Sequence, residues 1–148
     1  MVEKPHRVEL VLETLLESIS LAEQVGMCVA ASAGFDADDQ YKIGLAVHEG
    51  VMNAFQYGNQ QCREKQIRVI FELLDEKMVI HVLDQGCGFR IQDVPDPRTE
   101  ENIAGDSGRG VLLMRAFMDE FDVQTARNGG AEIIMAKRYP SLDRTLAT

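Results

Sequence analysis

Three groups of residues in this sequence have types and spacings that suit chemistry. Glu49 and Asn53 stand four residues apart in a stretch with helical spacing, so their side chains would lie over one another. The segment 84–88 (DQGCG) places a carboxylate and two glycines after an apolar stretch, and the segment 105–111 (GDSGRGV) leads into another helical pattern. A carboxylate, an amide and exposed backbone are groups that bind metal ions, close-packed ligands and phosphates.

Glu49 and Asn53 would project at the edge of an apolar helix face. At about 100° per residue, that face comprises Ile43, Ala46, Val47, Gly50, Val51 and Ala54. A carboxylate at such an edge loses solvation unless it has a partner, so the pair suits a metal ion or a water molecule. On its own, however, the pair is explained more simply as a solvated helix boundary.

The segment 84–88 follows the predicted strand 78–83 directly. Asp84 would stand at the edge of the sheet, and Gly86 and Gly88 would let the backbone pass close to a ligand because they lack a Cβ atom. Taken alone, this pattern also occurs in ordinary turns.

The segment 105–111 is predicted to form a phosphate site at the start of a helix. The first N–H groups of a helix have no partner within it, and the helix dipole adds positive potential there. Arg109 could add a charge-assisted contact. By itself the segment is equally compatible with a loop that ends at a helix.

Two common nucleotide-binding motifs are absent from the chain. Gly105 and Gly110 have the spacing of a P-loop, but Val111 stands where that motif needs a lysine. There is no complete G-x-G-x-x-G, and the H-R-D and D-F-G signatures of protein kinases are missing as well. A nucleotide site in this protein must therefore have another design.

Hydrophobic periodicity predicts the elements that position these residues. The predicted strands are 7–12, 67–73, 78–83, 122–127 and 131–138, and the predicted helices are 13–33, 37–57 and 111–120. Gly34 suits the end of the first helix, and Asp36 suits the cap of the second. Residues 85–109 are predicted to form a long polar and glycine-containing loop between the third strand and the third helix.

The order of these elements predicts an α+β fold. We expect a two-layer sandwich in which about three helices cover one face of a mostly antiparallel mixed sheet. The length of 148 residues favours a single domain over residues 1–148, with a loose C-terminal tail at about 139–148.

Composition excludes several classes of function. The formal net charge is −9, from 15 basic and 24 acidic residues, which argues against gripping a nucleic-acid backbone or an anionic membrane. No apolar run approaches the roughly 20 residues of a membrane helix. Cys28, Cys62 and Cys87 form no C-x-x-C pair, so neither a disulfide framework nor a zinc site is expected, and a reducing cytoplasm is the simplest location.

Taken together and in order, the three groups resemble the conserved boxes of the GHKL ATP-binding superfamily. The resemblance rests on Glu49-x-x-x-Asn53, on Asp84-x-Gly86-x-Gly88 and on Gly108-x-Gly110. Residues 45–54 (LAVHEGVMNA) and 112–120 (LLMRAFMDE) further resemble the bacterial anti-sigma-factor serine/threonine kinases. The similarity extends from about Val8 to Arg138, and it implies the Bergerat ATP-binding fold.

The resemblance implies ATP and Mg²⁺ as cofactors and assigns roles to individual residues. Glu49 would be the general base, and Asn53 would be a ligand of Mg²⁺. Asp84 would accept a hydrogen bond from the amino group of adenine. Gly86 and Gly88 would let the base lie close to the backbone.

The resemblance also assigns the phosphate end of the site. Gly108, Arg109, Gly110 and Val111 would bind the phosphates at the start of the third helix, and residues of about 89–109 would form a lid over ATP. Asp106 stands where the kinases of this family carry a basic residue, so Arg109 is the candidate substitute.

The function implied is that of a cytoplasmic serine/threonine kinase that phosphorylates a STAS-domain anti-anti-sigma protein. Sequestration of a sigma factor and formation of a homodimer are implied as well, with no nucleic-acid or membrane partner. Two alternatives stay open. One is an ATP-binding partner-switching module without phosphotransfer, which Asp106 favours. The other is an ATPase-like domain that works with a response-regulator phosphatase.

Overall fold

The computed structural model describes residues 6–86, 109–127 and 129–140. The elements in this part are β1 (Arg7–Glu13), α1 (Leu16–Ser32), α2 (Ala37–Asn53), η1 (Ala54–Gly58), β2 (Gln66–Leu73), β3 (Lys77–Leu83), α4 (Arg109–Phe117), β4 (Glu120–Thr125) and β5 (Ala131–Arg138). The predicted order of strands and helices is confirmed, and the boundaries shift by a few residues.

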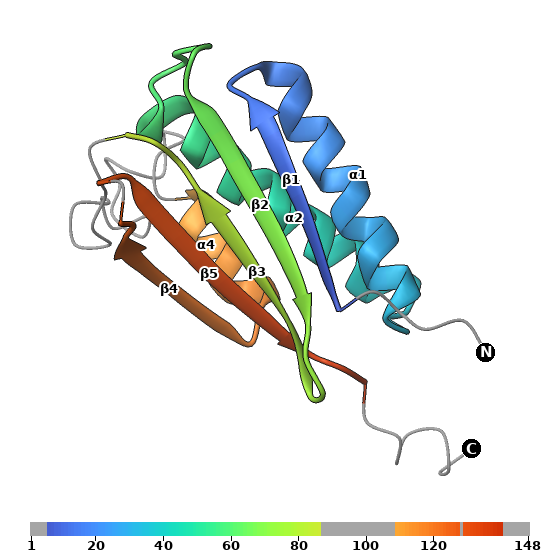
Figure 1. Ribbon diagram of the computed structural model, residues 1–148. Coiled ribbons are helices and arrows are strands. Elements are labelled where there is room, and N and C mark those ends of the chain that lie inside the picture. The colour runs from blue at the N-terminus through green and yellow to red at the C-terminus, as the bar shows by residue number, and fades with distance from the viewer. Residues whose placement is uncertain (1–5, 87–108, 128, 141–148) are drawn as a thin grey trace, which may run out of the picture.

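The strands form one sheet in the order β1-β2-β3-β5-β4. All four strand pairings in the described part are antiparallel, so this sheet contains none of the parallel pairing that a mixed sheet would have. Figure 1 shows α1, α2 and α4 together on one face of the sheet. The predicted two-layer α+β sandwich is confirmed.

The core lies between α2 and the middle strands. Ile67, Val69 and Phe71 alternate along β2 and are fully buried, as the period-two pattern predicts. Val47 and Val51 of α2 are also fully buried and belong to the same core cluster. Burial of each such side chain contributes about 1.5–3 kcal/mol, which fixes α2 on the sheet.

The boundary between the first two helices agrees with the sequence prediction. Gly34 has φ +95°, a conformation that glycine adopts without strain, and it follows the end of α1. The Asp36 side chain accepts a hydrogen bond from the N–H of Asp39 at 2.8 Å and caps α2.

The start of α1 corrects the prediction of a helix from Glu13. Thr14 is buried, and its hydroxyl donates to the carbonyl of Lys65 at 2.5 Å. Ser18 donates from its hydroxyl to the carbonyl of Glu13 at 2.7 Å. These bonds hold a turn between β1 and α1, so the helix begins at Leu16.

Helix α2 ends differently from the predicted helix 37–57. It changes at Ala54 into the π-helical segment η1, where the N–H of Asn59 donates to the carbonyl of Ala54 at 2.7 Å. A π-turn contains one residue more than an α-turn, and such turns are frequent at functional sites. The wider turn changes which side chains at the end of the helix face the sheet.

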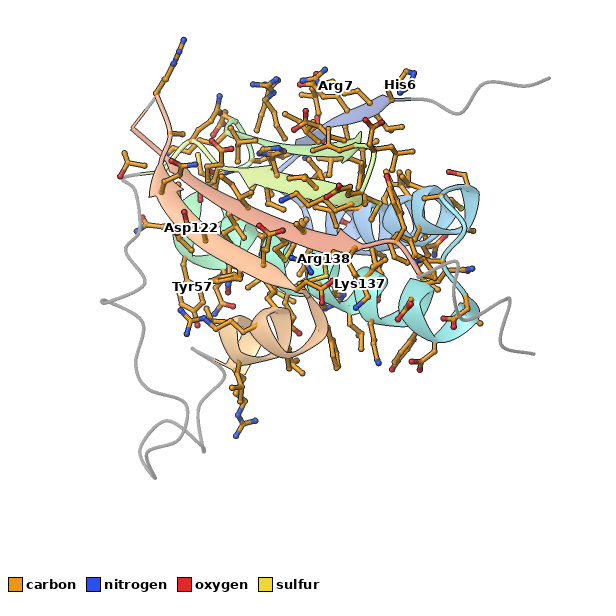
Figure 2. All side chains as sticks on the ribbon, turned by 90° about the horizontal axis from the view of Figure 1, so that it is seen from below. His6, Arg7, Tyr57, Asp122, Lys137 and Arg138 are labelled. Atoms are coloured by element: carbon orange, nitrogen blue, oxygen red, sulfur yellow. The ribbon has the colours of Figure 1, made fainter. Side chains whose placement is uncertain are left out.

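Helix α4 covers Arg109–Phe117, whereas the sequence predicted residues 111–120. The chain leaves the helix early because the N–H of Asp119 already donates to the carbonyl of Ala136 in β5. Lys137, seen from below in Figure 2, donates from Nζ to the carbonyl of Phe117 at 2.7 Å and thereby binds the last turn of α4.

The end of the chain is only partly described. The sequence assigned Tyr139 to the tail, but its ring packs against Phe35 with centroids 5.6 Å apart, and its N–H donates to Glu76. Residues 141–148 lie outside the described part. Within that part, no helix combines the length and the apolar character needed to cross a bilayer.

Candidate functional site

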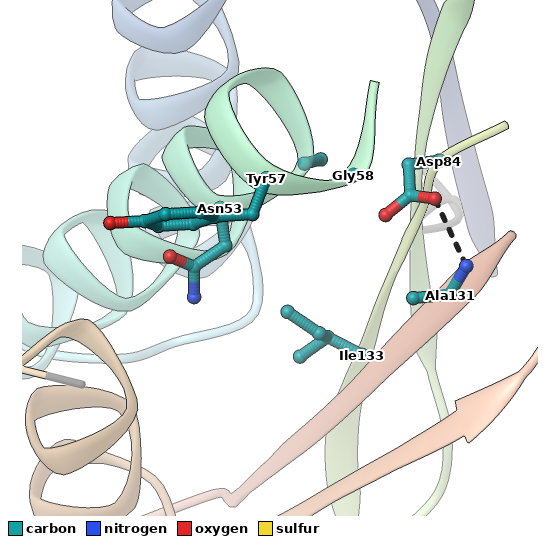
Figure 3. A pocket seen from close by; sticks show the side chains of 7 residues that line it. Asn53, Tyr57, Gly58, Asp84, Ala131 and Ile133 are labelled. Atoms are coloured by element: carbon teal, nitrogen blue, oxygen red, sulfur yellow. Dashed lines mark hydrogen bonds between the residues drawn. The ribbon is translucent and has the colours of Figure 1, made fainter. Parts of the chain in front are cut away.

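A small pocket lies between the end of α2 and the sheet. Its lining residues are Asn53, Ala54, Tyr57, Gly58, Asp84, Ala131 and Ile133, and Figure 3 shows them from close by. The pocket volume of about 10 Å³ is room for roughly one water molecule. A cavity of this size cannot enclose a whole nucleotide. The predicted residues Asn53 and Asp84 both belong to it.

Asp84 is held rigidly in the lining of this pocket. Its side chain is 5% exposed, and Oδ1 accepts hydrogen bonds from the N–H groups of Gly86 at 2.9 Å and Ala131 at 3.0 Å. The N–H of Asp84 in turn donates to the carbonyl of Ala131 at 3.1 Å. Figure 3 shows the second carboxylate oxygen directed away from Ala131 and toward the helix side of the pocket. A fixed carboxylate can accept a hydrogen bond from an amino group.

Glycines make room for Asp84 on two sides. A Cβ atom on Gly58 would lie 2.1 Å from Oδ2 of Asp84, and a Cβ atom on Gly86 would lie 1.9 Å from the carbonyl oxygen of Gly58. Gly130 is equally tight, because its Cβ atom would lie 2.1 Å from the carbonyl oxygen of Asp84. The sequence predicted a close approach of Gly86 to a ligand, whereas the close contact in the structure is with the backbone of Gly58. Gly58 was not among the predicted site residues.

Glu49 lies one helical turn before Asn53 and faces the start of α4. A Cβ atom on Gly110 would lie 2.7 Å from Oε2 of Glu49 and 3.5 Å from its Cβ. The first turn of α4 therefore packs directly on this carboxylate. Because the first N–H groups of a helix lack intrahelical partners, this turn presents donors beside an acidic group.

The other residues predicted at the phosphate end have different surroundings. Arg109 is exposed at the start of α4, while the side chain of Val111 is 8% exposed and belongs to the core. Val111 can thus offer a ligand only its backbone. Gly88, Gly108, Asp106 and the predicted lid up to residue 108 lie outside the described residues.

Four of the predicted residues in the described part lie in one row. Asp84 and Asn53 share the pocket, Glu49 lies one helical turn before Asn53 in α2, and Gly110 packs on Glu49. The sequence missed Tyr57 and Ile133, which line the same pocket. The only sequence signal that could have indicated Tyr57 as a pocket residue is its position close after Asn53. Nothing in the sequence around Ile133 distinguishes it from other core residues.

Residues 12–137 of the chain match the family described as histidine kinase-like ATPase domain. The protein belongs to this family. The match covers all the predicted site residues, from Glu49 to Val111. A row of residues that joins α2, the turn after β3 and the start of α4 is therefore the candidate ATP site of a histidine kinase-like ATPase domain.

Two relatives of this histidine kinase-like ATPase domain are named an anti-sigma factor and a serine-protein kinase. It is 25% identical over 132 residues to the anti-sigma F factor of Clostridium beijerinckii, which covers 84% of this chain and 92% of the relative. It is 30% identical over 116 residues to the serine-protein kinase RsbW of Bacillus velezensis, with 74% of this chain and 71% of the relative covered.

Solved structures show the same fold at lower identity. The RsbU and RsbW domains of a Mycobacterium tuberculosis protein match with a TM-score of 0.64 and 18% identity, over 91% of this chain and 33% of that one. A mycobacterial sensor histidine kinase, MprB, matches with a TM-score of 0.54 and 14% identity, over 89% of this chain and 97% of that one. This chain thus spans about a third of the longer structure, and these two likenesses concern the fold.

Proposed function

We propose that this histidine kinase-like ATPase domain is an ATP- and Mg²⁺-dependent protein serine/threonine kinase of the anti-sigma type. The observation that carries the proposal is the row in which Asp84 and Glu49 occupy opposite ends and Asn53 lies between them. One carboxylate suits recognition of a base, and the other suits chemistry at the phosphates. A nucleotide is a ligand that needs both at once.

The described residues fit the two cofactors. Asp84 would accept a hydrogen bond from the amino group of adenine, and Gly58 and Gly86 leave the room that its carboxylate and its turn need beside η1. Asn53 would supply an amide oxygen to Mg²⁺, which prefers oxygen ligands and neutralises phosphate charge when bound. The backbone at Gly110 and the side chain of Arg109 would bind phosphate oxygens.

The reaction is a transfer of the γ-phosphoryl group to a protein hydroxyl. The hydroxyl oxygen of a serine or threonine forms a bond to the γ-phosphorus, and the bond from that phosphorus to the bridging oxygen of ADP breaks. Glu49 accepts the proton of the hydroxyl, which makes the oxygen a better nucleophile. Positioning and charge neutralisation supply most of the catalysis in such transfers.

The relatives' names support the choice of partners. One relative is called an anti-sigma factor and another a serine-protein kinase. For this chain we propose a STAS-domain anti-anti-sigma protein as the phosphoryl acceptor and a sigma factor as the second partner, in the cytoplasm. A homodimer is proposed on the resemblance alone.

A second function, ATP-dependent sequestration without phosphotransfer, has one observation in its favour. Asp106 places a negative charge where a basic residue would contact the γ-phosphate in the kinases that the sequence resembles. In this case ATP would regulate the binding of a partner without reacting. Arg109 decides between the two functions if it can substitute for the missing cation.

The test is a phosphotransfer assay with labelled ATP, Mg²⁺ and the STAS-domain protein encoded nearest to this chain's gene. We expect transfer of label to that protein, and a loss of at least about a hundredfold in Glu49→Gln, because loss of a general base typically costs 10²–10⁴ in rate. Glu17→Gln, an exposed change on α1, is the matched control. Tight ATP binding without transfer to any STAS-domain protein would favour the sequestration module instead.

A further inference from the structure

Asn59, which follows η1 directly, is a fully buried polar side chain outside the pocket lining. Its Nδ2 donates to Oγ1 of Thr14 at 2.9 Å and to the carbonyl of Gln66 at 3.0 Å. Its Oδ1 accepts a hydrogen bond from the N–H of Gln85 at 2.7 Å. Both amide hydrogens and one lone pair of the amide oxygen are thus used, and donors and acceptor on opposite sides hold this buried amide in one orientation.

These bonds join segments that are far apart in the sequence. Thr14 belongs to the turn between β1 and α1, Gln66 begins β2, and Gln85 follows Asp84 in the turn after β3. Asn59 reaches all three from the end of the long helix that carries Asn53. It is therefore the point where the helix and the base-recognition turn are tied together.

Gln85 is held by its side chain as well as by its backbone. Its Oε1 accepts a hydrogen bond from the N–H of Gln66 at 2.6 Å, in addition to the bond from its own N–H to Asn59. Gln85 occupies the unspecified position x of the Asp84-x-Gly86 pattern. Its backbone and side chain nevertheless make the two hydrogen bonds that anchor the turn. Because Asp84 and Gly86 are its chain neighbours, these anchors hold the backbone of the turn whose Gly86 N–H binds the Asp84 carboxylate.

The π-turn explains how Asn59 arrives at this position. The bond from its N–H to Ala54 closes the wide turn of η1, and the next two residues, Gln60 and Gln61, have φ angles of 51° and 60°. Left-handed backbone at two successive non-glycine residues costs free energy and persists where the surroundings impose it. The strained backbone at Gln60 and Gln61 directly follows the buried Asn59 amide, whose hydrogen bonds offset the free-energy cost of this strain.

We propose that Asn59 is a positioning residue for base recognition, which acts through the N–H of Gln85 to fix the carboxylate of Asp84. The inference rests on the proposed ATP binding and adds to it the residue that sets base affinity and selectivity. Asn59 need not touch the nucleotide. Its side chain fixes the turn that carries the pocket's carboxylate, an acceptor that can distinguish an amino group from a carbonyl on the base.

The first test needs no nucleotide. We compare amide hydrogen exchange in the wild type, in Asn59→Ala and in the control Thr14→Val, which removes one partner of Asn59 but leaves its bond to Gln85. Relative to the core amide of Val69, we expect exchange of the Gln85 N–H to be at least about tenfold faster in Asn59→Ala, as loss of one hydrogen bond predicts. Unchanged protection of Gln85 in a folded Asn59→Ala would overturn the proposal.

The second test measures the ratio of ATP to GTP affinity by competition against a fluorescent ATP analogue. In Asn59→Ala we expect ATP affinity to fall about tenfold or more and the ratio of ATP to GTP affinity to move toward one. In Thr14→Val we expect the wild-type ratio, despite a lower stability of the fold. A merely structural role would move both variants alike, and an equal ratio in both would refute the inference. Gln85→Pro, at an exposed residue, deletes this hydrogen bond and also the one that the Gln85 side chain accepts, whereas Gln85→Ala deletes only the second. A narrower ratio in Gln85→Pro than in Gln85→Ala gives the answer if Asn59→Ala does not fold.

Asp84→Asn distinguishes failure of this inference from failure of the proposed function. If Asp84→Asn loses selectivity and Asn59→Ala does not, only the positioning role is wrong. If the wild type does not bind ATP, or if Asp84→Asn changes nothing, the proposed base site itself is wrong. The exchange of the Gln85 amide still decides in that case whether Asn59 fixes the turn.

Discussion

The carboxylate of Glu49 packs against the backbone of Gly110, so closely that a Cβ atom on this glycine would lie 2.7 Å from Oε2. This contact joins α2, which carries the proposed general base, to the first turn of α4, which carries the proposed phosphate donors. The two parts of the catalytic end are thus positioned by each other. A methyl group at residue 110 would separate them.

We expect Gly110→Ala to lower phosphotransfer by at least about tenfold without unfolding the protein. The clash involves the far end of a flexible side chain, so Glu49 can swing away at little cost, and alanine favours a helix over glycine by up to about 1 kcal/mol. Initial rates with saturating ATP, together with thermal melting, check this outcome. A variant with full activity would show that Glu49 needs no fixed position.

We expect Gly58→Ala to abolish ATP binding, because its methyl group would overlap the carboxylate of Asp84. Gly44→Ala is the matched control on the same long helix, since its methyl group would meet Met27 at 2.7 Å, away from the site. Isothermal titration with ATP checks both variants at equal folded fraction. Equal losses in the two variants would mean that packing, and not the position of Asp84, controls binding.

We expect Asp84→Asn to fold normally and to lose discrimination between ATP and GTP. The asparagine oxygen can still accept the bonds from Gly86 and Ala131, while the new amide nitrogen donates where the carboxylate oxygen accepted. ATP affinity should fall about tenfold or more, which corresponds to about 1.4 kcal/mol. Competition binding with both nucleotides measures the effect, and an unchanged preference for ATP would remove Asp84 from base recognition.

We expect the affinity for ATP to depend on Mg²⁺ in the wild type and not in Asn53→Ala. Removal of the amide oxygen deletes a proposed ligand of the ion, so chelation by EDTA should weaken ATP binding in the wild type alone. Gln56→Ala, an exposed change close by on η1, serves as the control. If Asn53→Ala retains the full effect of EDTA, the metal is bound by other residues.

Local patterns in the sequence were sufficient for most of the fold. The alternation through Ile67, Val69 and Phe71 and the cap at Asp36 are confirmed, because burial of every second side chain and side-chain capping are decided within a few residues. The sequence placed the end of α4 too late. Its last predicted residues satisfy helix spacing, but the N–H of Asp119 finds a partner in β5.

The sequence predicted the site residues that stand in local motifs. It missed the residues that line the pocket beside them or hold them in place. Glu49, Asn53 and Asp84 stand in patterns that can be seen in one segment at a time. Their approach to one another is consistent with the prediction, while Gly88 and Gly108 stay predictions. Tyr57 and Asn59 carry no such pattern, because the meaning of each depends on a strand or turn far away in the chain.

The sequence by itself determined the element order, the two layers and the three motifs, since these depend on periodicity and on local backbone preferences. Only the tertiary structure decided that helix α2 widens into a π-turn, that Gly58 makes room for Asp84 and that Asn59 ties the turn at Gln85. The physical reason is that a buried amide must satisfy all its hydrogen bonds, and its partners come from segments that meet only after folding.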